Sequence, residues 1–535
     1  MNFEQKIKTM PHDEVWREYC GFLDLDIAGF MRIQNRLMEE QISLWAKSGI
    51  AKDFLRGKEA NTIADFRRIM PLTRYEDYAD ALLPKRSDLL PAEPIVWAQT
   101  TWEGGRHPFK VAPYTEGMLE AFRSNMVASM ILATGKDRTG FSVRPHDSML
   151  YALAPLPYVT GLMPLAAEEE INLDILPPVK QAAQMTFSER NKKGFQMGLK
   201  RGGIDLFFGL GSVTYYVSQS ITTLGSGAKK SQSVEKLNVS PKMALRYLHA
   251  KRVCKREGRE LKPKDIFSLK GLVVAGTDNA CYKDELEELW GVRPMEIFAG
   301  TEPSCIGTET WSRDGMYFFP DACFYEFIPQ NEMMKSLRDG TYKPKTYLMD
   351  EVVPGEVYEL VISVLRGGAF MRYRVGDVYR CLGLEHTGDE TRLPRFQYID
   401  RVPNVIDIAG FTRITEYTVE SAIELSGLQI EDWIARKQYS ENKRPYISMV
   451  VELSAMSLVS AAVSRDLLRE HLSIYFKHVD EDYQSLKKLL GIEPLEIIIV
   501  PCGTFARYRS RTDRPLDRIN SSLYDVKELL EELYL

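Results

Sequence analysis

From about residue 90 onwards, short apolar runs alternate along the chain with segments of helical periodicity. The runs "GIDLFFGLGS" and "LKGLVVAG" are typical of buried strands. Between them, "SPKMALRYLHAKRVCKREG" is predicted to be a helix, because Ser240 can cap it, Pro241 suits its first position and Gly258 suits its end. Strands that alternate with helices predict an α/β fold.

The length of the chain indicates more than one domain, because 535 residues exceed what one hydrophobic core usually serves. Residues 13–56 have apolar side chains at helical spacing. After residue 404 comes a smaller unit with two strands, helices, a further strand "LEIIIVP" and a terminal helix "LYDVKELLEELYL". We therefore expect a large α/β domain followed by a small one.

Charge and composition exclude several classes of protein. A net charge of −5 gives no general attraction to nucleic acids or acidic membranes. The basic run from Lys251 to Lys264 contains glutamates and no aromatic platform, so we interpret it as a solvated helix face and expect no nucleic-acid partner. Seven cysteines without a C-x-x-C pair fit neither a disulfide framework nor a zinc ribbon, and we expect reduced thiols.

One stretch, residues 148–167, carries no charge and has the length of a membrane span. Pro155, Pro157 and Pro164 would break a helix in lipid, where the freed backbone groups find no partner. We interpret the stretch as a buried strand and loop beside a site. The charged N-terminal residues have no apolar signal core, and a cytoplasmic protein with no membrane partner is expected.

Four separated segments together predict a nucleotide site. Residues 99–110, "QTTWEGGRHPFK", have the outline of a phosphate-binding loop. Residues 297–303, "IFAGTEP", end a strand with an aromatic ring that can stack on a purine and a carboxylate that can hold Mg²⁺. Residues 372–377, "RYRVGD", present Asp377 after a glycine turn, and a carboxylate can accept both hydroxyls of a ribose. Residues 399–420 supply an arginine, a strand and a glycine before a second strand and a helix.

The order and spacing of these segments resemble the adenylate-forming superfamily of acyl-activating enzymes. Within it, the chain is most similar to the auxin-responsive acyl-acid amido synthetase family (Gretchen Hagen type). The specific marks are "PLTRYEDY" at 71–78, "FFPDACFYEFIP" at 318–329 and "VYELVISVLRGGAFMRYRVGDV" at 357–378. The resemblance covers roughly residues 63 to 515, which is nearly the whole chain.

The resemblance implies a large N-terminal adenylate-forming α/β domain and a smaller mobile C-terminal α/β domain. An N-terminal helical segment, residues 1–62, would pack on the large domain. The large domain, residues 63–403, would bind ATP and the acyl group. The small domain, residues 404–535, would follow a hinge near Asn404.

The resemblance also implies the roles of individual residues. Four residues of the first segment would face the phosphates of ATP: Thr100, Thr101, Gly104 and Gly105. The other nucleotide contacts would be Phe298 and Gly300 flanking the adenine beside Thr301, Glu302 binding Mg²⁺, Asp377 binding the ribose, and Arg401 binding the ribose or the α-phosphate. Candidate walls of an acyl pocket among residues 151–225 are Tyr158, Phe207 and Phe208. Each of these aromatic residues also suits core packing.

The phosphate loop departs from the family pattern, which reads serine-serine-glycine-threonine-serine-glycine-glycine. Here Thr101 replaces a glycine, while Trp102 and Glu103 replace hydroxyl residues. Threonine suits neither a close backbone approach nor a positive φ. A glutamate near a triphosphate adds about 1–4 kcal/mol of repulsion per charge pair. Three basic residues that follow would offset this repulsion if they point inward: Arg106, His107 and Lys110.

The C-terminal domain departs from the pattern in a second way. The family places a lysine that reaches the phosphates where this chain has Arg509, in "RYRSR", and a second lysine where it has Arg413. Both changes keep the positive charge, but arginine binds phosphate as a planar fork rather than a point charge. We expect both arginines to act as catalytic cations.

The implied reaction has two steps and uses ATP and Mg²⁺. A small carboxylic acid attacks the α-phosphate of ATP to give an acyl-adenylate and pyrophosphate, and an amine, usually an amino acid, then displaces AMP to form an amide. A CoA ligase that acts from the same adenylate is an alternative. Because the phosphate loop is altered, a non-catalytic nucleotide- or acyl-binding protein is a further alternative.

Overall fold

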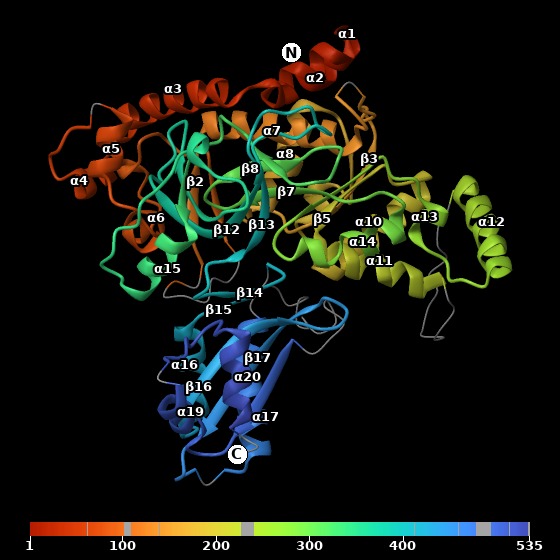
Figure 1. Cartoon of the computed structure of the whole chain (residues 1–535). Coiled ribbons are helices and arrows are strands. Elements are labelled where there is room, and N and C mark those ends of the chain that lie inside the picture. Colours follow the sequence, from red (N-terminus) through yellow and green to blue (C-terminus); the bar gives the residue numbers. More distant parts are fainter. Residues whose placement is uncertain are drawn as a thin grey trace. The chain divides into compact units, whose positions relative to one another are not determined.

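The computed structural model describes residues 1–60, 62–100, 107, 109–138, 140–225, 240–410, 412–457, 459–477, 494–512 and 514–532. The chain divides into two compact units (Figure 1). The larger unit contains residues 1–100 and 110–399, and the smaller unit contains residues 400–535. The division falls close to Asn404, where a hinge is expected, and the hinge motion itself remains a prediction.

The larger unit begins with the helices α1 (Phe3–Thr9), α2 (His12–Cys20), α3 (Ile27–Trp45) and α4 (Gly49–Leu55). Asn2, Asp26 and Ser48 cap three of them, because each side chain accepts a hydrogen bond from a backbone amide of the first turn. At the end of α3 the indole N–H of Trp45 donates to the Ala369 carbonyl at 2.9 Å. This bond ties the N-terminal helices to the core of the larger unit.

Among the described residues, eleven strands form the main sheet of the larger unit, in the spatial order β10, β11, β12, β13, β9, β8, β7, β6, β5, β3, β4. In this spatial order the strands from β4 to β7 pair in parallel, whereas the described pairs from β7 to β10 are antiparallel. The strands are β3 (Ser148–Ala152), β4 (Asp174–Leu176), β5 (Leu206–Leu210), β6 (Gly271–Ala275), β7 (Met295–Gly300), β8 (Ser304–Glu309), β9 (Met316–Phe318), β10 (Cys323–Pro329), β11 (Val357–Val364), β12 (Tyr373–Gly383) and β13 (Arg395–Arg401).

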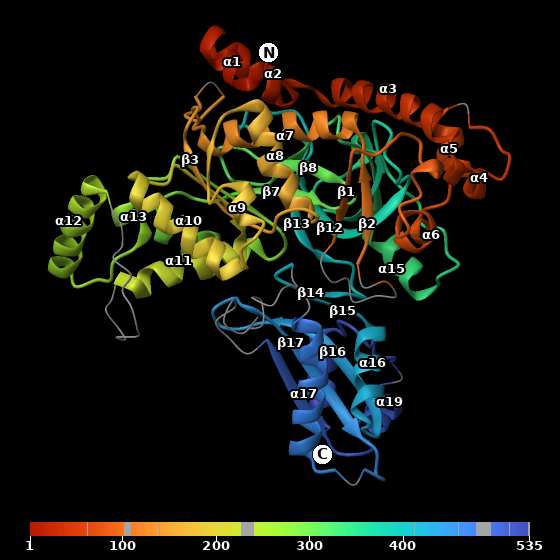
Figure 2. The ribbon, with the colours of Figure 1, turned by 180° about the vertical axis from the view of Figure 1, so that it is seen from behind.

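Helices surround this sheet, as the alternating sequence pattern predicts, so the α/β fold class is confirmed. Both views of the ribbon place α7 and α8 on one side of β7 and α11 on the other (Figures 1 and 2). The remaining helices are α5 (Ile63–Ile69), α6 (Ala79–Leu82), α7 (Glu116–Thr134), α8 (Leu162–Glu170), α9 (Val179–Ala182), α10 (Phe187–Arg201), α11 (Gly211–Gly225), α12 (Pro241–Glu257), α13 (Pro263–Ile266), α14 (Lys283–Trp290) and α15 (Gln330–Arg338).

The helix predicted from "SPKMALRYLHAKRVCKREG" is confirmed as α12. The Ser240 side chain accepts from the Met243 amide, Pro241 is the first helical residue, and Gly258 ends the helix with a φ of +67°. A residue with a side chain would be strained at that φ, whereas glycine is not. Local cap chemistry therefore sets both ends of this helix.

The uncharged stretch 148–167 begins as the predicted buried strand, which is β3, but the expected loop is wrong from Leu162 onwards. Those residues form α8, with Pro164 in its first turn. A proline is tolerated there because the missing N–H has no intrahelical partner at that position. In the part of the chain that the structure describes, no helix has the length and apolarity that crossing a bilayer requires.

The smaller unit has its own core. Its described strands form two sheets. One consists of β14 (Ile406–Ile408) and β15 (Thr412–Ile414), and the other of β16 (Ile430–Tyr439), β17 (Pro445–Leu453) and β18 (Leu495–Val500). Its helices are α16 (Glu416–Ser426), α17 (Ala461–Lys477), α19 (Thr504–Thr512) and α20 (Leu523–Glu531). Ile434, Val450, Phe505 and Tyr508 pack together in this core. The predicted strand "LEIIIVP" and the predicted terminal helix are confirmed as β18 and α20.

Candidate active site

The parallel strands of the larger unit define one edge at which a ligand can bind. β3, β5, β6 and β7 run in the same direction, so their carboxyl ends lie at one edge of the sheet. Open α/β sheets bind ligands outside these carboxyl ends. The segment after β6 turns sharply there, with φ of +95° at Gly276 and +59° at Asp278, and Thr301 and Glu302 follow β7 at the same edge.

Glu302 is held by two side chains that come from distant parts of the chain. One carboxylate oxygen, Oε1, accepts from the Tyr373 hydroxyl at 2.6 Å and from the Lys110 ammonium at 3.1 Å. The Lys110 nitrogen also lies 5.7 Å from the centre of the Tyr75 ring and 6.0 Å from that of Tyr373. Glu302 is 7% exposed, so this is a nearly buried ion pair beside two aromatic faces.

The ends of the predicted phosphate loop are fixed by a short hairpin. β1 (Val96–Gln99) pairs antiparallel with β2 (Val111–Tyr114). Beyond it, the Thr100 amide donates to the Lys110 carbonyl at 3.0 Å, and the Lys110 amide donates to the Thr100 hydroxyl at 2.9 Å. The hairpin thereby aims Lys110 at Glu302. The predicted phosphate contacts Thr101, Gly104 and Gly105 lie outside the described residues, as do Trp102 and Glu103 of the same loop, and those predictions stay untested.

Phe298, the predicted adenine-stacking residue, lies on β7 and is 8% exposed. Its ring packs at 6.1 Å against Tyr398 in a stacked geometry and at 5.5 Å against Tyr379 edge to face. Gly300 lies close to Pro303, because a Cβ at Gly300 would come within 3.0 Å of the proline ring. The Thr301 carbonyl accepts from the Tyr114 hydroxyl at 2.9 Å. The Phe298 ring is therefore part of an aromatic cluster, and a hydrogen bond from Tyr114 holds the backbone that follows it.

Asp377, the predicted ribose contact, lies within β12 and is 1% exposed. The sequence predicts a glycine turn before it, and this detail is wrong. Gly376 has a φ of +82°, but the strand continues, because Leu360 of β11 stands opposite three residues, 375–377, in a bulge. The bulge places Asp377 beside an irregular part of the pairing without ending the strand.

The three predicted walls of the acyl pocket separate into different environments. Phe207 packs edge to face on Trp290 at 5.3 Å, whereas Phe208 stacks on Tyr151 at 5.9 Å. Successive residues of a strand point to opposite faces of the sheet, so the two phenylalanines cannot line one pocket on one face. Phe207 belongs to the packing around α14, and Phe208 stays a candidate. Tyr158 is half-buried in the segment after β3, beside Gln99.

The three predicted cations of the smaller unit all have carboxylate partners within that unit. Arg401 Nε lies 3.9 Å and Arg413 Nε lies 3.3 Å from the same oxygen of Asp407, which is fully buried. Arg509 lies on α19 with its side chain 57% exposed, and its Nη1 is 2.9 Å from Asp432. The Asp432 carboxylate is buried, but it also pairs with Arg518, so it keeps a cation when the exposed Arg509 side chain moves away.

Sequence reasoning missed a buried charge network beside the nucleotide segments. Lys283 donates to Glu309 at 2.5 Å and lies 3.1 Å from Glu296, which also accepts from the Asn279 amide at 3.0 Å. Burial lowers the pKa of Lys283, but the two carboxylates outweigh burial and raise it. Burial raises the pKa of Glu309 against the opposing effect of Lys283. The Asn279 amide also donates to the Gly276 carbonyl, so the network supports the turn after β6.

Comparison with known proteins supports the resemblance seen in the sequence. Residues 316–401 match the GH3 family central domain, a span that includes Tyr373 and Asp377. The fold is similar to that of GH3.15 acyl acid amido synthetase in complex with 2,4-DB, with 18% identity, a TM-score of 0.51, and coverage of 97% of this chain and 96% of that chain. It is also similar to 2-hydroxyisobutyryl-CoA ligase in complex with 2-HIB-AMP and CoA, with 16% identity, a TM-score of 0.56, and coverage of 95% and 92%. A search of curated protein sequences finds no match.

Proposed function

We propose that this chain, which carries the GH3 family central domain, is an adenylate-forming ligase that joins a small carboxylic acid to an amine. In the first step, a carboxylate oxygen of the acid attacks the α-phosphorus of ATP, and pyrophosphate leaves with its bonding electron pair. In the second step, the nitrogen of an amine attacks the acyl carbon, AMP leaves, and the nitrogen loses a proton. The amino group of an amino acid is the proposed acceptor.

The observation that carries this proposal is the cluster of Glu302, Lys110 and Tyr373 at the carboxyl edge of the parallel strands. Mg²⁺ prefers oxygen ligands and is usually held by one or two carboxylates together with substrate phosphates, so the Glu302 carboxylate fits it. When bound, Mg²⁺ would neutralise charge on the phosphates. Lys110 supplies a fixed positive charge close to this carboxylate, where charge develops on the departing pyrophosphate.

The proposed nucleotide contacts of the larger unit have complementary chemistry. Phe298, Gly300 and Thr301 present an aromatic ring and a close backbone to the adenine. Asp377 presents a carboxylate that can accept from the ribose hydroxyls. The Thr100 hydroxyl accepts from the Lys110 amide, so the first residue of the phosphate loop is already positioned. These groups bind and orient the nucleotide, which is the main contribution that such a reaction needs from the protein.

In the smaller unit, Arg413 and Arg509 are the proposed catalytic cations, and Arg401 is the proposed contact to the ribose or the α-phosphate. Each is held by a carboxylate and keeps a guanidinium group that suits phosphate oxygens. The proposed location is the cytoplasm, because all seven cysteines are free thiols, the state that a reducing compartment maintains.

The test is acid-dependent release of pyrophosphate from Mg-ATP by the purified protein, screened with aryl, indolyl and fatty carboxylic acids. We expect release with at least one acid class, and an at least tenfold lower rate in Glu302→Gln, which keeps the shape of the side chain but removes its charge (removing an electrostatic transition-state contact typically costs about 10²–10³ in rate). Lys343→Glu, an exposed change elsewhere in the larger unit, is the control and should retain the wild-type rate. ATP binding without release for any acid would support the non-catalytic alternative.

A CoA ligase acting from the same adenylate remains the second candidate, because the fold likeness to 2-hydroxyisobutyryl-CoA ligase has the higher TM-score of the two similarities above. The two candidates differ only in the final nucleophile. Competition between CoA and an equimolar mixture of amino acids for the accumulated adenylate, followed by mass spectrometry, distinguishes an amide from a thioester.

A further inference from the structure

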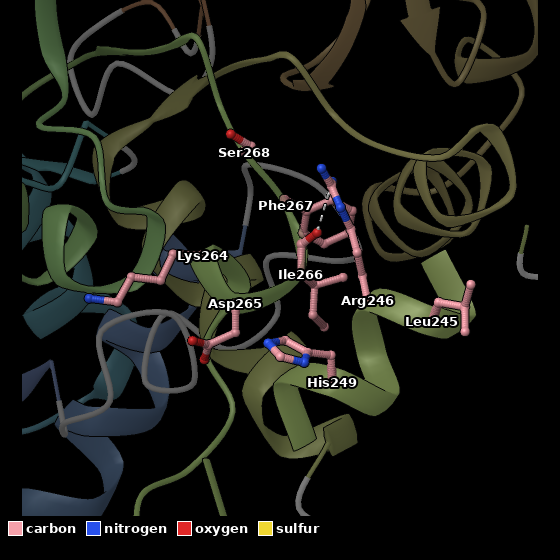
Figure 3. Close-up of a pocket in the computed structure, with 8 residues that line it drawn as sticks. All are labelled: Leu245, Arg246, His249, Lys264, Asp265, Ile266, Phe267 and Ser268. Atoms are coloured by element: carbon pink, nitrogen blue, oxygen red, sulfur yellow. Dashed lines mark hydrogen bonds between the residues drawn. The ribbon is translucent and has the colours of Figure 1, made fainter. Parts of the chain in front are cut away.

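A hollow of the larger unit lies beside α12, away from the segments described above (Figure 3). Its volume is about 510 Å³, and its walls come from α12 and from the residues at and after α13. Leu245 and Ile266 supply apolar surface, while Arg246, His249 and Lys264 supply basic groups. This volume falls within the range of about 300–1,000 Å³ that is usual for ligand pockets.

The lining of the hollow has an excess of positive charge. Asp265, the acidic residue of the lining, forms an ion pair with Arg259, which donates one hydrogen bond of 2.8 Å to each of the two carboxylate oxygens. Within the described part of the chain, Arg246, His249 and Lys264 form no ion pair, and Arg246 donates only to the Ile266 carbonyl at 3.5 Å. Charged groups of one sign that line a hollow attract a partner of the opposite sign.

The helix beside the hollow also exposes apolar side chains. α12 packs on the larger unit through Met243, Ala250 and Cys254, which are buried at helical spacing. On its open side Leu245 is 70% exposed and Leu248 is 51% exposed. Residues three apart are neighbours on a helix, so the two leucines form one apolar strip, and Leu245 of this strip also lines the hollow.

We propose that the hollow and the leucine strip, defined by Leu245, Leu248, Arg246, His249 and Lys264, are a docking site for an acidic segment of a partner protein that carries a large apolar side chain. Charge complementarity selects the acidic residues, and the hollow beside the strip takes the apolar anchor.

Two other occupants fit these observations less well. A small organic anion in the hollow would leave Leu248 and most of the strip uncovered. An anionic membrane needs a helix with a broad apolar face, whereas α12 buries Met243, Ala250 and Cys254 against the protein and exposes a strip of two leucines. A peptide segment covers both the strip and the hollow.

The experiment uses the full-length protein and two synthetic fluorescein-labelled peptides. One is a short glutamate-rich peptide with a central pair of leucines, and the matched peptide has serines in their place. Fluorescence anisotropy measures binding. We expect the leucine peptide to bind at least tenfold more tightly, and each of Arg246→Glu and Leu245→Ser to weaken it by about tenfold or more (each tenfold step corresponds to about 1.4 kcal/mol). Circular dichroism checks that the variants fold.

Lys343→Glu is the matched control, since it makes the same charge change on an exposed lysine outside the site. Equal loss of binding in Lys343→Glu would overturn the proposal, because only the overall charge would matter. Equal binding of the two peptides would overturn it by removing the apolar anchor. Binding of octanoate with displacement of the leucine peptide, or binding of phosphatidylserine vesicles without binding of either peptide, would assign the surface to another class of ligand and overturn it as well.

Discussion

The ion pair between Lys110 and Glu302 permits a quantitative test of the candidate site. At 3.1 Å and an effective dielectric constant of about 20, the two charges attract each other by about 5 kcal/mol. Desolvation offsets much of this attraction, but breaking a buried pair by removing one partner typically costs about 3–5 kcal/mol, because the other charge stays buried. We therefore expect Lys110→Met and Glu302→Gln each to lower the free energy of unfolding by about 3 kcal/mol.

The assay is a double-mutant cycle followed by chemical denaturation and tryptophan fluorescence. The double variant leaves no unpaired charge, so its loss should be about 2–3 kcal/mol smaller than the sum of the single losses. Lys8→Met removes the exposed pair between Lys8 and Glu4 and should change stability by less than about 0.5 kcal/mol. If the loss of stability in the double variant equals the sum of the two single losses to within about 0.5 kcal/mol, the pairing of Lys110 with Glu302 is refuted.

Three further predictions concern residues of both units. Asp377→Asn should weaken ATP binding by about tenfold in calorimetric titration, and an unchanged affinity would remove the ribose assignment. Arg509→Ala should change stability by less than about 1 kcal/mol, because the Arg509 side chain is exposed and Asp432 keeps its ion pair with Arg518, while pyrophosphate release falls at least tenfold; unaltered release would show that Arg509 is not catalytic. Lys283→Met leaves Glu309 buried without its cation, which raises the pKa of Glu309 further. The free energy of unfolding of this variant should therefore fall as the pH rises from 5 to 8. A loss of stability that does not depend on pH would contradict the network.

Features set by local chemistry were predictable from the sequence. The ends of α12 follow from Ser240 and Gly258, whose cap roles need only their neighbours in the chain. The position of Glu302 after a buried strand follows from the strand pattern and the spacing of the family motif. The sequence therefore predicts the carboxylate itself but not its surroundings.

Partners that approach across the fold were not predictable. Lys110 and Glu302 are 192 residues apart in the sequence, and Tyr373 lies 71 residues beyond Glu302. Lys283 and its carboxylates come from separate elements, and no spacing in the sequence indicates that they meet. Which long-range side chains share a site is decided by the topology of the sheet.

Other differences between the predicted and the observed structure arise where the position of a residue in its helix or strand outweighs the usual preference of that residue type. Pro164 does not prevent α8, because it stands in the first turn. Gly376 forms a bulge rather than a turn, because β11 continues to pair on both sides of it. The aromatic character of Phe207 and Phe208 suggests one shared pocket, but the alternation of side chains along the strand places their rings on opposite faces of the sheet.

The central claim is that the acid is activated as an adenylate, and isotope transfer tests it most directly. The acid that supports pyrophosphate release is prepared with ¹⁸O in its carboxylate and incubated with Mg-ATP and the acceptor. Attack of the carboxylate on the α-phosphorus predicts ¹⁸O in the phosphate of AMP after amide formation. ¹⁸O in inorganic phosphate, with ADP as the nucleotide product, would contradict the account, because the acid would then have been activated at the γ-phosphate.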